Sequence, residues 1–422
     1  MLNSQTLPRF RTRDPRRRAF FVSYGAGHIA KIAPVVRELR RQGVECLLMA
    51  LTIGYPKARQ LGLEPMGYRD FLPLLGPRME EALSWGDRLL VGNTHPEVDL
   101  EETRCYLGIN FLQWVDAEGE VAARLRYQQR GRQGFMPVDF MGRVLDALQP
   151  GLVVATSTPR SEEAAIRSAV SRGIPTLTMV DLFAPESDPF LYRPVHARCI
   201  TVIATEVRER FLAHGLASNQ VFVTGSPDFD ELFDPCAVEQ GRALRAKLGW
   251  EGFHIVLWAG ILEPDHATFP GAAFGLAVEQ ALRAWVKNTP QTGLIVRYHP
   301  AQYHEFARLA PQEGVHLSIP RVDPIAPLLH AADTVIHQVS TVGLQAAVLG
   351  KRVLHLGFSA WVQSADFDLG SLGPSELVNS LDEIATMLNN RPAPAADRPV
   401  SVPQGPATPR IAELALQLLN SP

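Results

Sequence analysis

Short apolar runs alternate with longer amphipathic stretches over most of the chain. This alternation is typical of βα units, in which helices cover a sheet of buried parallel strands. In the first unit, residues 19–24 predict a buried strand, residues 25–28 (GAGH) a tight turn, and residues 29–41 a helix. The next apolar runs predict strands at 44–51, 151–155, 176–180, 199–204 and 221–224.

A second series of apolar runs begins after the polar region at 226–250. Between residues 67 and 132 the pattern is mixed and mainly helical. The two series together predict an α/β protein with two Rossmann-like domains, at 18–225 and 226–390. The strands expected in the second series are 255–259, 294–298, 334–337 and 352–355.

The end of the chain, residues 391–422, combines two features. A Pro-rich tract comes first, and it cannot form a regular helix or a central strand because proline lacks an N–H and fixes φ. Apolar side chains at helical spacing follow it. We therefore expect an extended strap and a terminal helix that docks back on the body; the apolar positions of that helix are Ile411, Leu414, Leu416 and Leu419.

Composition narrows the classes of protein. The 422 residues carry a net charge of −3, so no global field favours nucleic acid. The four cysteines lack CxxC spacing, which indicates reduced thiols in a cytoplasmic protein. No apolar run is long enough to cross a bilayer. Arginines crowd residues 1–17, which predicts a poorly ordered basic arm or one that contacts anionic lipid head groups or an anionic substrate.

Ligands of open parallel sheets bind beyond the carboxyl ends of the strands, so the loops there are the places to search. Gly25 and Gly27 follow the first strand and permit close approach of a ligand to the backbone. His28, just behind them, either contacts an acceptor or a diphosphate, or simply caps the helix. A dinucleotide fingerprint is weak here, because the second strand ends without an Asp or Glu.

The second domain has three such loops. Gly260 and Glu263 follow its first strand; Glu263 is either a base or hydroxyl ligand, or a solvated loop residue. His299 ends the strand 294–298, and Pro300 restricts the backbone there, so the imidazole is positioned to donate to a phosphate.

The third loop is the polar cluster inside TVIHQVSTVGLQAAVL, at residues 334–349. Ser340 and Thr341 lie between a predicted strand and the helix that follows it, so one of these hydroxyls is expected to cap the N-terminus of that helix. Two hydroxyls with a glycine close behind also favour anion binding at free N–H groups. The nucleotide-binding candidates in this loop are Gln338, Ser340, Thr341 and Gly343.

These residues resemble the GT-B class of glycosyltransferases. Residues 223–230 (VTGSPDFD) resemble the interdomain segment of UDP-N-acetylglucosamine 2-epimerases and capsule-synthesis transferases, and residues 323–353 resemble the nucleotide-binding βα unit of the class. The resemblance extends from about residue 18 to 388. It implies two Rossmann-like domains facing across a cleft, the first for the acceptor and the second for the nucleotide donor.

The pairing of His299 and Pro300 with Ser340 and Thr341 is similar to that in bacterial sialyl-, Kdo- and glycerophosphate transferases. There these residues bind the phosphate of a cytidine nucleotide, so the resemblance implies a CMP- or UDP-linked donor between His299 and the two hydroxyls. Two departures stand out. Gln345 occupies the place of a ribose-binding Glu of UDP-sugar enzymes, and the loop at 260–263 lacks the His-Arg of the epimerases.

The resulting prediction is a glycosyltransferase of polysaccharide biosynthesis that moves a sugar from a nucleotide sugar to a glycan, lipid or protein hydroxyl. Loop amides and a helix dipole stabilise the leaving phosphate, so we expect no metal and no cofactor. The expected general base is Asp181, after the strand 176–180, or Glu263. The alternatives are an epimerase or hydrolase of UDP-N-acetylglucosamine and a non-catalytic GT-B binding module.

Overall fold

The protein is described by a computed structural model covering residues 17–157, 159–180, 183–185, 187–193, 196–265, 271–300, 302–306, 308–320, 322–364, 375–390 and 401–421. The chain divides into two compact units. Unit 1 comprises residues 1–228 and 407–422, and unit 2 comprises residues 229–406. Each unit is built on one parallel sheet, which confirms the two predicted Rossmann-like sheets. The predicted basic arm, except for Arg17, lies outside the described residues.

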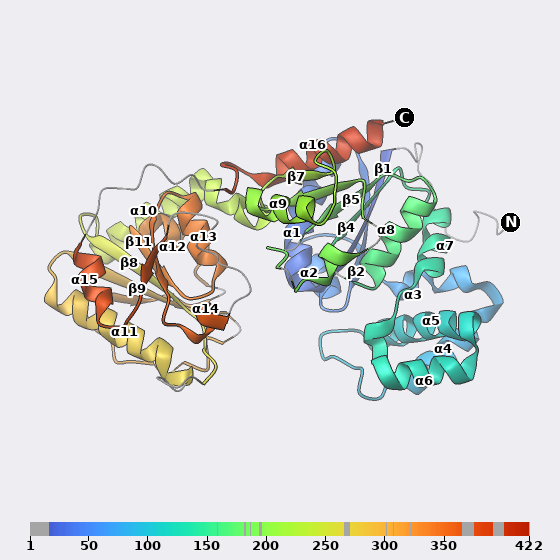
Figure 1. Cartoon of the computed structure of the whole chain (residues 1–422), viewed down its shortest axis with the longest axis horizontal. Helices are drawn as coiled ribbons and strands as arrows, with labels where there is room; N and C mark the ends of the chain where they lie inside the picture. The colour runs from blue at the N-terminus through green and yellow to red at the C-terminus, as the bar shows by residue number, and fades with distance from the viewer. Residues whose placement is uncertain are drawn as a thin grey trace. The chain divides into compact units, whose positions relative to one another are not determined.

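The sheet of unit 1 has seven strands in the order β3-β2-β1-β4-β5-β6-β7, and every neighbouring pair is parallel (Figure 1). Six of the strands coincide with predicted apolar runs to within a few residues. The edge strand β3 was not predicted, because two residues are too few to show a period. The strands are β1 Arg18–Tyr24, β2 Glu45–Leu51, β3 Pro65–Met66, β4 Leu152–Thr156, β5 Thr176–Met179, β6 Cys199–Val202 and β7 Val221–Val223.

Helices cover this sheet. Several helices that come between β3 and β4 in the sequence form a separate layer, in agreement with the mainly helical pattern predicted for residues 67–132 (Figure 1). In that layer α4 and α5 cross closely, since a Cβ at Gly108 would lie 1.9 Å from the Ala82 carbonyl oxygen. We call residues 67–134 the helical segment. The helices of unit 1 are α1 Gly25–Arg41, α2 Gly54–Gln60, α3 Tyr68–Phe71, α4 Met79–Leu89, α5 Leu100–Glu118, α6 Glu120–Arg130, α7 Val138–Leu148, α8 Ser161–Ser171, α9 Thr205–Ala213 and α16 Ala407–Asn420.

The predicted tight turn at residues 25–28 is wrong, because α1 begins directly at Gly25. Gly25 has φ +77°, a conformation that glycine adopts without a Cβ penalty. One residue therefore makes the change of direction, and no separate turn is needed. Gly27 and His28 consequently lie in the first turn of the helix, which buries Ile29, Ile32, Val36 and Leu39 on its inner face.

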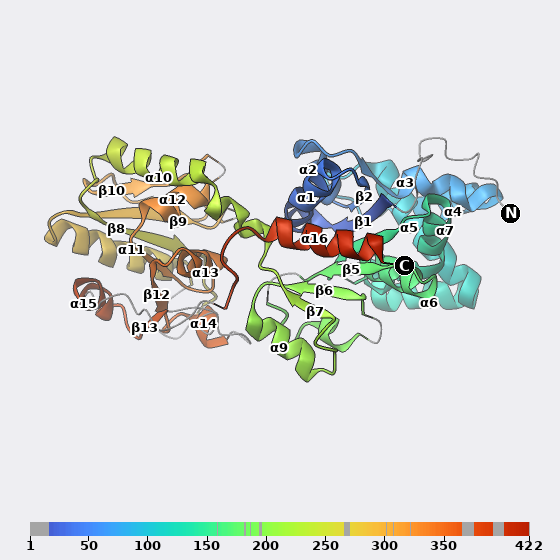
Figure 2. The same ribbon diagram turned by 90° about the horizontal axis from the view of Figure 1, so that it is seen from above.

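The C-terminal helix docks back on the body as predicted. α16 packs beside α1 and buries Ile411, Ala412, Ala415 and Leu418 in the core of unit 1 (Figure 2). The spacing of these positions is that of one helix face. Arg410 Nε also donates to the carbonyl oxygen of Thr224, 2.9 Å away. Most of the Pro-rich strap lies outside the described residues.

Unit 2 contains a six-stranded parallel sheet in the order β10-β9-β8-β11-β12-β13 (Figure 2). The predicted strand 334–337 coincides with β11, whereas the short edge strands β10 and β13 were not predicted. The elements are α10 Pro235–Leu248, β8 His254–Gly260, α11 Gly271–Asn288, β9 Thr292–Tyr298, β10 Val315–Leu317, α12 Ile325–Ala331, β11 Thr334–His337, α13 Thr341–Val348, β12 Arg352–Leu356, α14 Ala360–Ser364, β13 Glu376–Val378 and α15 Glu383–Asn389.

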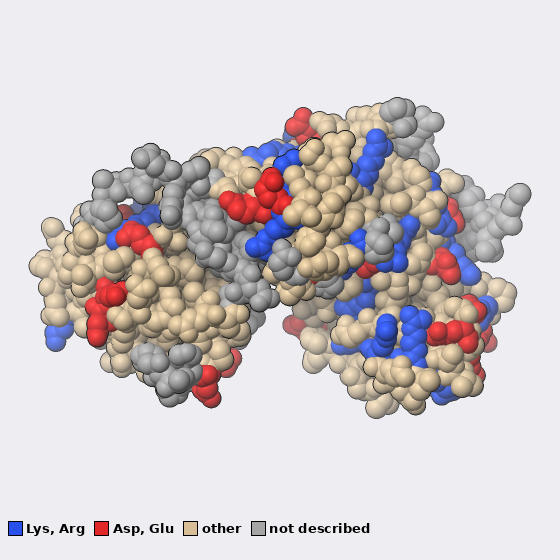
Figure 3. Space-filling model, viewed as in Figure 1, with Lys and Arg blue, Asp and Glu red and all other residues tan. Residues whose placement is uncertain are grey.

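The distribution of surface charge and the absence of a long apolar helix in the described part of the chain agree with the small net charge and the lack of long apolar runs in the sequence. Acidic and basic side chains are interspersed on the face drawn in Figure 3, without one dominant sign. Among the described residues, no helix combines the length and the apolar character that a membrane span requires.

Candidate functional site

The predicted nucleotide-binding residues of unit 2 meet at the carboxyl edge of its sheet. β8 pairs with β9 on one side and with β11 on the other, so the strand order reverses at β8. A reversal of this kind leaves a crevice beyond the strand ends, which is the usual place for a ligand in an open α/β sheet. Gly260 ends β8 there, and the loops after β9 and β11 flank it.

His299 follows β9 at this edge. Its backbone N–H donates to the carbonyl oxygen of Gly260 at 3.0 Å, which ties the two loops together. The side chains of His299 and Pro300 are exposed. The strand end therefore presents an accessible imidazole beside the glycine, in the position where the sequence predicts a phosphate contact.

Ser340 caps α13, which confirms the predicted N-cap. Its backbone is extended, and its hydroxyl accepts a hydrogen bond of 3.2 Å from the N–H of Val342. Ser340 and Thr341 are both half-buried. The amides and positive dipole end of α13 thus open on the same edge as His299, and this arrangement favours an anion.

Two stacked histidines lie beneath the start of α13. The rings of His337 and His355, paired across β11 and β12, are stacked in nearly parallel planes with their centres 4.8 Å apart. Burial, together with the neighbouring His355, lowers the pKa of His337 to about 3, so this imidazole is neutral at physiological pH. Gly343 is required here, because a Cβ at that position would lie 2.2 Å from His337 Nε2.

Glu263 and Gln338 fasten the loops of this edge to one another. Gln338 is fully buried; its Oε1 accepts from the N–H of Ile261 at 2.9 Å, and its Nε2 donates to Glu263 Oε1. Glu263 also accepts from the hydroxyl of Ser359 and, at 2.7 Å, from the N–H of Ala360. Both side chains therefore hydrogen-bond to the protein's own loops, and their predicted contacts with a ligand stay predictions.

The first-domain candidates lie at the carboxyl edge of the other sheet, in unit 1. Gly25 is buried, Gly27 is exposed and His28 is half-buried, all in the first turn of α1. Asp181, predicted as a general base, lies outside the described residues. Its role stays a prediction, as do the ligand contacts of the glycines and His28.

A pocket of about 190 Å³ opens at this same edge of unit 1. Its floor is formed by Tyr24 at the end of β1, by residues 51–53 after β2, and by the start of α8 at residues 160–162. The helical segment closes the other side, mainly through Tyr68, Tyr106 and the loop at residues 93–98. None of the first-domain residues predicted from the sequence is among those that line this pocket; Gly25 follows the lining residue Tyr24 in the chain.

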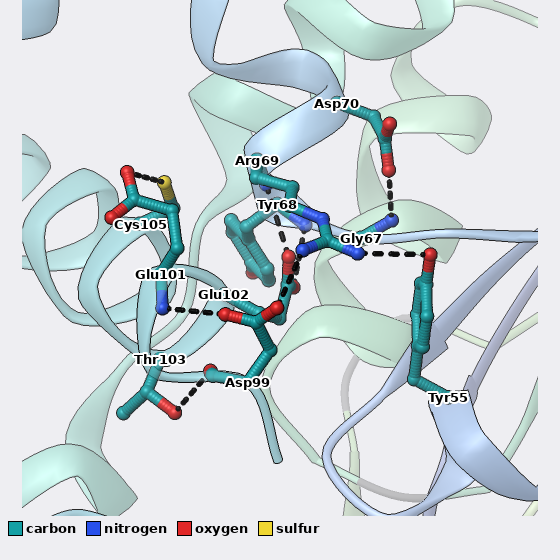
Figure 4. Close-up of polar contacts among 10 residues, drawn as sticks. All are labelled: Tyr55, Gly67, Tyr68, Arg69, Asp70, Asp99, Glu101, Glu102, Thr103 and Cys105. Carbon is teal, nitrogen blue, oxygen red and sulfur yellow. Dashed lines mark hydrogen bonds and ion pairs between the residues drawn. The ribbon is translucent and has the colours of Figure 1, made fainter.

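A hydrogen-bonded network fixes the helical wall of the pocket (Figure 4). The buried carboxylate of Glu102 accepts from the N–H groups of Tyr68 at 2.6 Å and Arg69 at 3.1 Å, which satisfies the first amides of α3. Arg69 in turn joins Asp99, at the start of α5, to the hydroxyl of Tyr55 in α2. The network links the helical segment to α2 and so holds this wall of the pocket in place.

Burial shifts the pKa values of the titratable groups in this wall. It is the main reason why the pKa values of Glu102, Tyr68 and Tyr106 are raised. Burial also works to lower the pKa of Arg160, but the neighbouring Tyr106 and Tyr24 outweigh it and the pKa is raised. Arg160 therefore stays a cation beside the hydroxyl of Tyr106, which stays protonated.

No group of three or more His, Cys, Asp or Glu side chains in the described part of the chain is arranged to hold a metal ion. The sequence Asp-Phe-Asp occurs twice, at residues 228–230 and 366–368. Asp228 of the first pairs with the buried Lys31 at 3.5 Å, and the second lies outside the described residues.

Solved structures of UDP-N-acetylglucosamine 2-epimerases resemble the chain over nearly its whole length. The enzyme from Neisseria meningitidis, solved with UDP-GlcNAc bound, is 14% identical with a TM-score of 0.55, covering 95% of this chain and all of that one. The enzyme from Methanocaldococcus jannaschii is 12% identical with a TM-score of 0.58 over 95% and 99% of the two chains. A putative epimerase from Listeria monocytogenes is 15% identical with a TM-score of 0.55, over 93% and 94%.

No protein-family model and no curated protein sequence matches the chain. At such low identities the structural likeness establishes the GT-B-like fold of these epimerases and nothing finer.

Proposed function

We propose that this protein is an enzyme that acts on a nucleotide sugar, and that the nucleotide phosphates bind in unit 2 between His299 and the start of α13. The observation that carries the proposal is the convergence of an exposed imidazole, a capped helix N-terminus and Gly260 at the point where the strand order reverses. Convergence of this kind supplies both a donor and a positive dipole for an anion. The epimerase-like fold supports the choice of a nucleotide sugar.

For the reaction itself, we place chemistry on the nucleotide sugar alone first, because the similar structures are 2-epimerases. UDP-N-acetylglucosamine is then the first substrate to test. Glycosyl transfer is the second candidate, and the pocket of unit 1 favours it, since a transferase needs a site for an acceptor.

Glu263 enters the proposal as a positioning residue. Three donors hold its carboxylate in place, so its part is to fix the loop after β8 beside the phosphate site. Gln338 has the same part from the side of β11. The general base of the reaction must then be sought elsewhere, with Asp181 still the first-domain candidate.

The nucleotide site is tested by thermal shift with UDP, UDP-GlcNAc, CMP, CDP and GDP. We expect at least one of them to raise the melting temperature of the wild type, and His299→Ala to weaken that ligand's binding about tenfold, as the loss of a hydrogen bond to a charged group does. His304→Ala is the matched control, because this histidine of unit 2 is likewise exposed and comes later in the chain after β9. If no nucleotide shifts the wild type, the site assignment fails.

The reaction is tested by incubating the protein with UDP-GlcNAc without an acceptor and following the sugar by NMR. Inversion at C2, or release of UDP with free sugar, identifies chemistry on the nucleotide sugar alone. Release of UDP only after a glycan, lipid or protein acceptor is added identifies the transferase. Binding without any turnover under all of these conditions argues for a non-catalytic module.

A further inference from the structure

The pocket of unit 1 combines apolar walls with aromatic rings. Leu51, Ile53 and Val98 supply aliphatic surface, and the rings of Tyr24 and Tyr106 face the same space. The walls are held in place from behind, because Tyr68 stacks on Phe140 and its hydroxyl bonds to that of Ser161 at 2.7 Å. A ligand here meets flat, amphipathic surfaces that need no rearrangement.

Arg160 brings a positive charge to these walls. Its guanidinium lies 4.9 Å from the centre of the Tyr24 ring. Arginines of the helical segment such as Arg69 and Arg104 form ion pairs with aspartates. In contrast, neither Arg160 nor Arg132, which is exposed at the rim of the pocket, forms an ion pair with a carboxylate in the described part of the chain. The buried carboxylate of Glu162 also lines the pocket and attracts the Arg160 cation. The planar guanidinium of Arg160 has a shape that suits a carboxylate or phosphate.

The backbone around the pocket is strained where these side chains enter it. Arg160 has φ +74° and ψ −115°, and Thr52 has φ +53°. Such conformations are costly for residues with a Cβ, most of all for a β-branched one, and they persist where the surroundings enforce them. Two of the five described non-glycine residues with positive φ thus line this one pocket.

The size of the pocket limits what it can hold. Its volume of about 190 Å³ exceeds the roughly 150 Å³ of an engineered cavity that takes up benzene, so one substituted six-membered ring fits. A whole nucleotide, with a base, a ribose and a phosphate, is larger than one such ring. Rings of tyrosine on the walls and a guanidinium at one end match a ring with two apolar faces and one anionic substituent.

We propose that this pocket binds an anionic monosaccharide unit, that is, a six-membered sugar ring carrying a carboxylate or a phosphate. Arg160 binds the anionic group, and the rings of Tyr24 and Tyr106 pack against the sugar. This inference concerns binding in unit 1 by itself. The further role of the bound sugar as acceptor or as part of the substrate rests on the proposed function.

The test uses the full-length chain and calorimetric titration with glucuronate, glucose 6-phosphate, glucose and inorganic phosphate. We expect glucuronate or glucose 6-phosphate to bind about tenfold more tightly than glucose, because a charge-assisted hydrogen bond to Arg160 is added. The tighter of the two identifies the anionic group. Equal binding of glucose, binding of inorganic phosphate as tight as that of the sugars, or no binding of any sugar overturns the proposal.

Variants assign the binding to the pocket. Arg160→Gln should remove the preference for the anionic sugars and leave the weak binding of glucose. Arg41→Gln is the matched control, since Arg41 is an exposed arginine at the last residue of α1 in the same unit. Unchanged glucuronate and glucose 6-phosphate binding in Arg160→Gln contradicts the inference.

A second variant guards against misfolding of the first. Val98→Trp fills the pocket from a loop whose side chain is only half-buried, and it should abolish binding of every sugar probe. Retained sugar binding in Val98→Trp overturns the inference. UDP is titrated into the same proteins. If the sugars bind and UDP does not, the nucleotide site of unit 2 is contradicted and this inference stands. If UDP binds and the sugars do not, this inference is contradicted and the nucleotide site stands.

Discussion

The carboxyl edges of the two sheets are both formed by the ends of parallel strands, but different structures cover them. In unit 2 the polar side chains of the strand-end loops bond to one another: Gln338 and Glu263 join the loops after β8 and β11, and Ser359 adds the loop after β12. In unit 1 the corresponding edge is covered by the helical segment, and a pocket remains between the two layers. A polar residue at a strand end can therefore join neighbouring loops to one another rather than contact a ligand.

A buried carboxylate lies at the centre of each arrangement. Glu263 accepts hydrogen bonds from two side chains and one amide that belong to different loops. Among the described residues, Glu102 accepts hydrogen bonds from two consecutive amides at the start of α3 and from no side chain. Removing the first carboxylate should loosen an entire edge, whereas changing the second should affect one helix end, and this difference can be measured.

The largest effect is expected for Glu263→Ala. The substitution leaves two buried side-chain donors and one part-buried N–H without their acceptor, and each costs of the order of 1 kcal/mol, so unit 2 should lose about 3 kcal/mol of its free energy of unfolding. Hydrogen exchange read on peptides of each unit measures the loss and assigns it. Glu251→Ala, at an exposed position of unit 2, should change little. Equal exchange in both variants would show that Glu263 fastens nothing.

The next effect is a pH dependence confined to unit 2. The pKa of His337 is lowered to about 3 in the folded chain, whereas an unfolded histidine titrates near 6.5. Below pH 6.5 the unfolded state binds the extra proton, so stability is complete above that pH and is lost as the pH falls toward 3. At pH 5 the loss amounts to about 2 kcal/mol.

Urea unfolding between pH 7.5 and 5, followed by hydrogen exchange on β11 and β12 peptides, measures this loss. His337→Gln removes the titrating group, so its unfolding free energy should decline less over the same range. A decline as steep as in the wild type would mean that other groups carry the pH dependence.

Local sequence signals predict some features of the unit 2 edge and not others. The strand 334–337 and the cap at Ser340 were predictable, because apolar runs and hydroxyls at helix starts are local signals. The partnership of Gln338 with Glu263 was not, since these residues are 75 positions apart and only the sheet order brings them together. Glu263 was therefore predicted as a catalytic candidate, with no sign of the three bonds that hold it.

The pocket of unit 1 was still less accessible to prediction. Its walls come from two strand ends, from the start of α8 and from a helical segment whose pattern was only mixed. Arg160 follows a predicted strand and could have been noticed there, as a basic residue in a strand-end loop. Its backbone conformation and the absence of a salt bridge to it among the described residues are visible only in three dimensions.

The smallest effect is expected for Glu102→Gln in unit 1. The amide keeps one acceptor for Tyr68 or Arg69 and leaves the other N–H without one, which costs about 1 kcal/mol. Because burial raises the pKa of Glu102, the folded wild type binds a proton more readily than the unfolded chain, and it gains stability as the pH falls through that raised pKa toward 4.5. The cost of the substitution should therefore grow on acidification, which is opposite in sign to the His337 effect in unit 2. Urea titrations of the wild type and variant at pH 7 and pH 5, with exchange read on α3 and α5 peptides, decide the sign, and a cost that shrinks at pH 5 would mean that the amides of α3 stabilise the charged carboxylate more than burial penalises it.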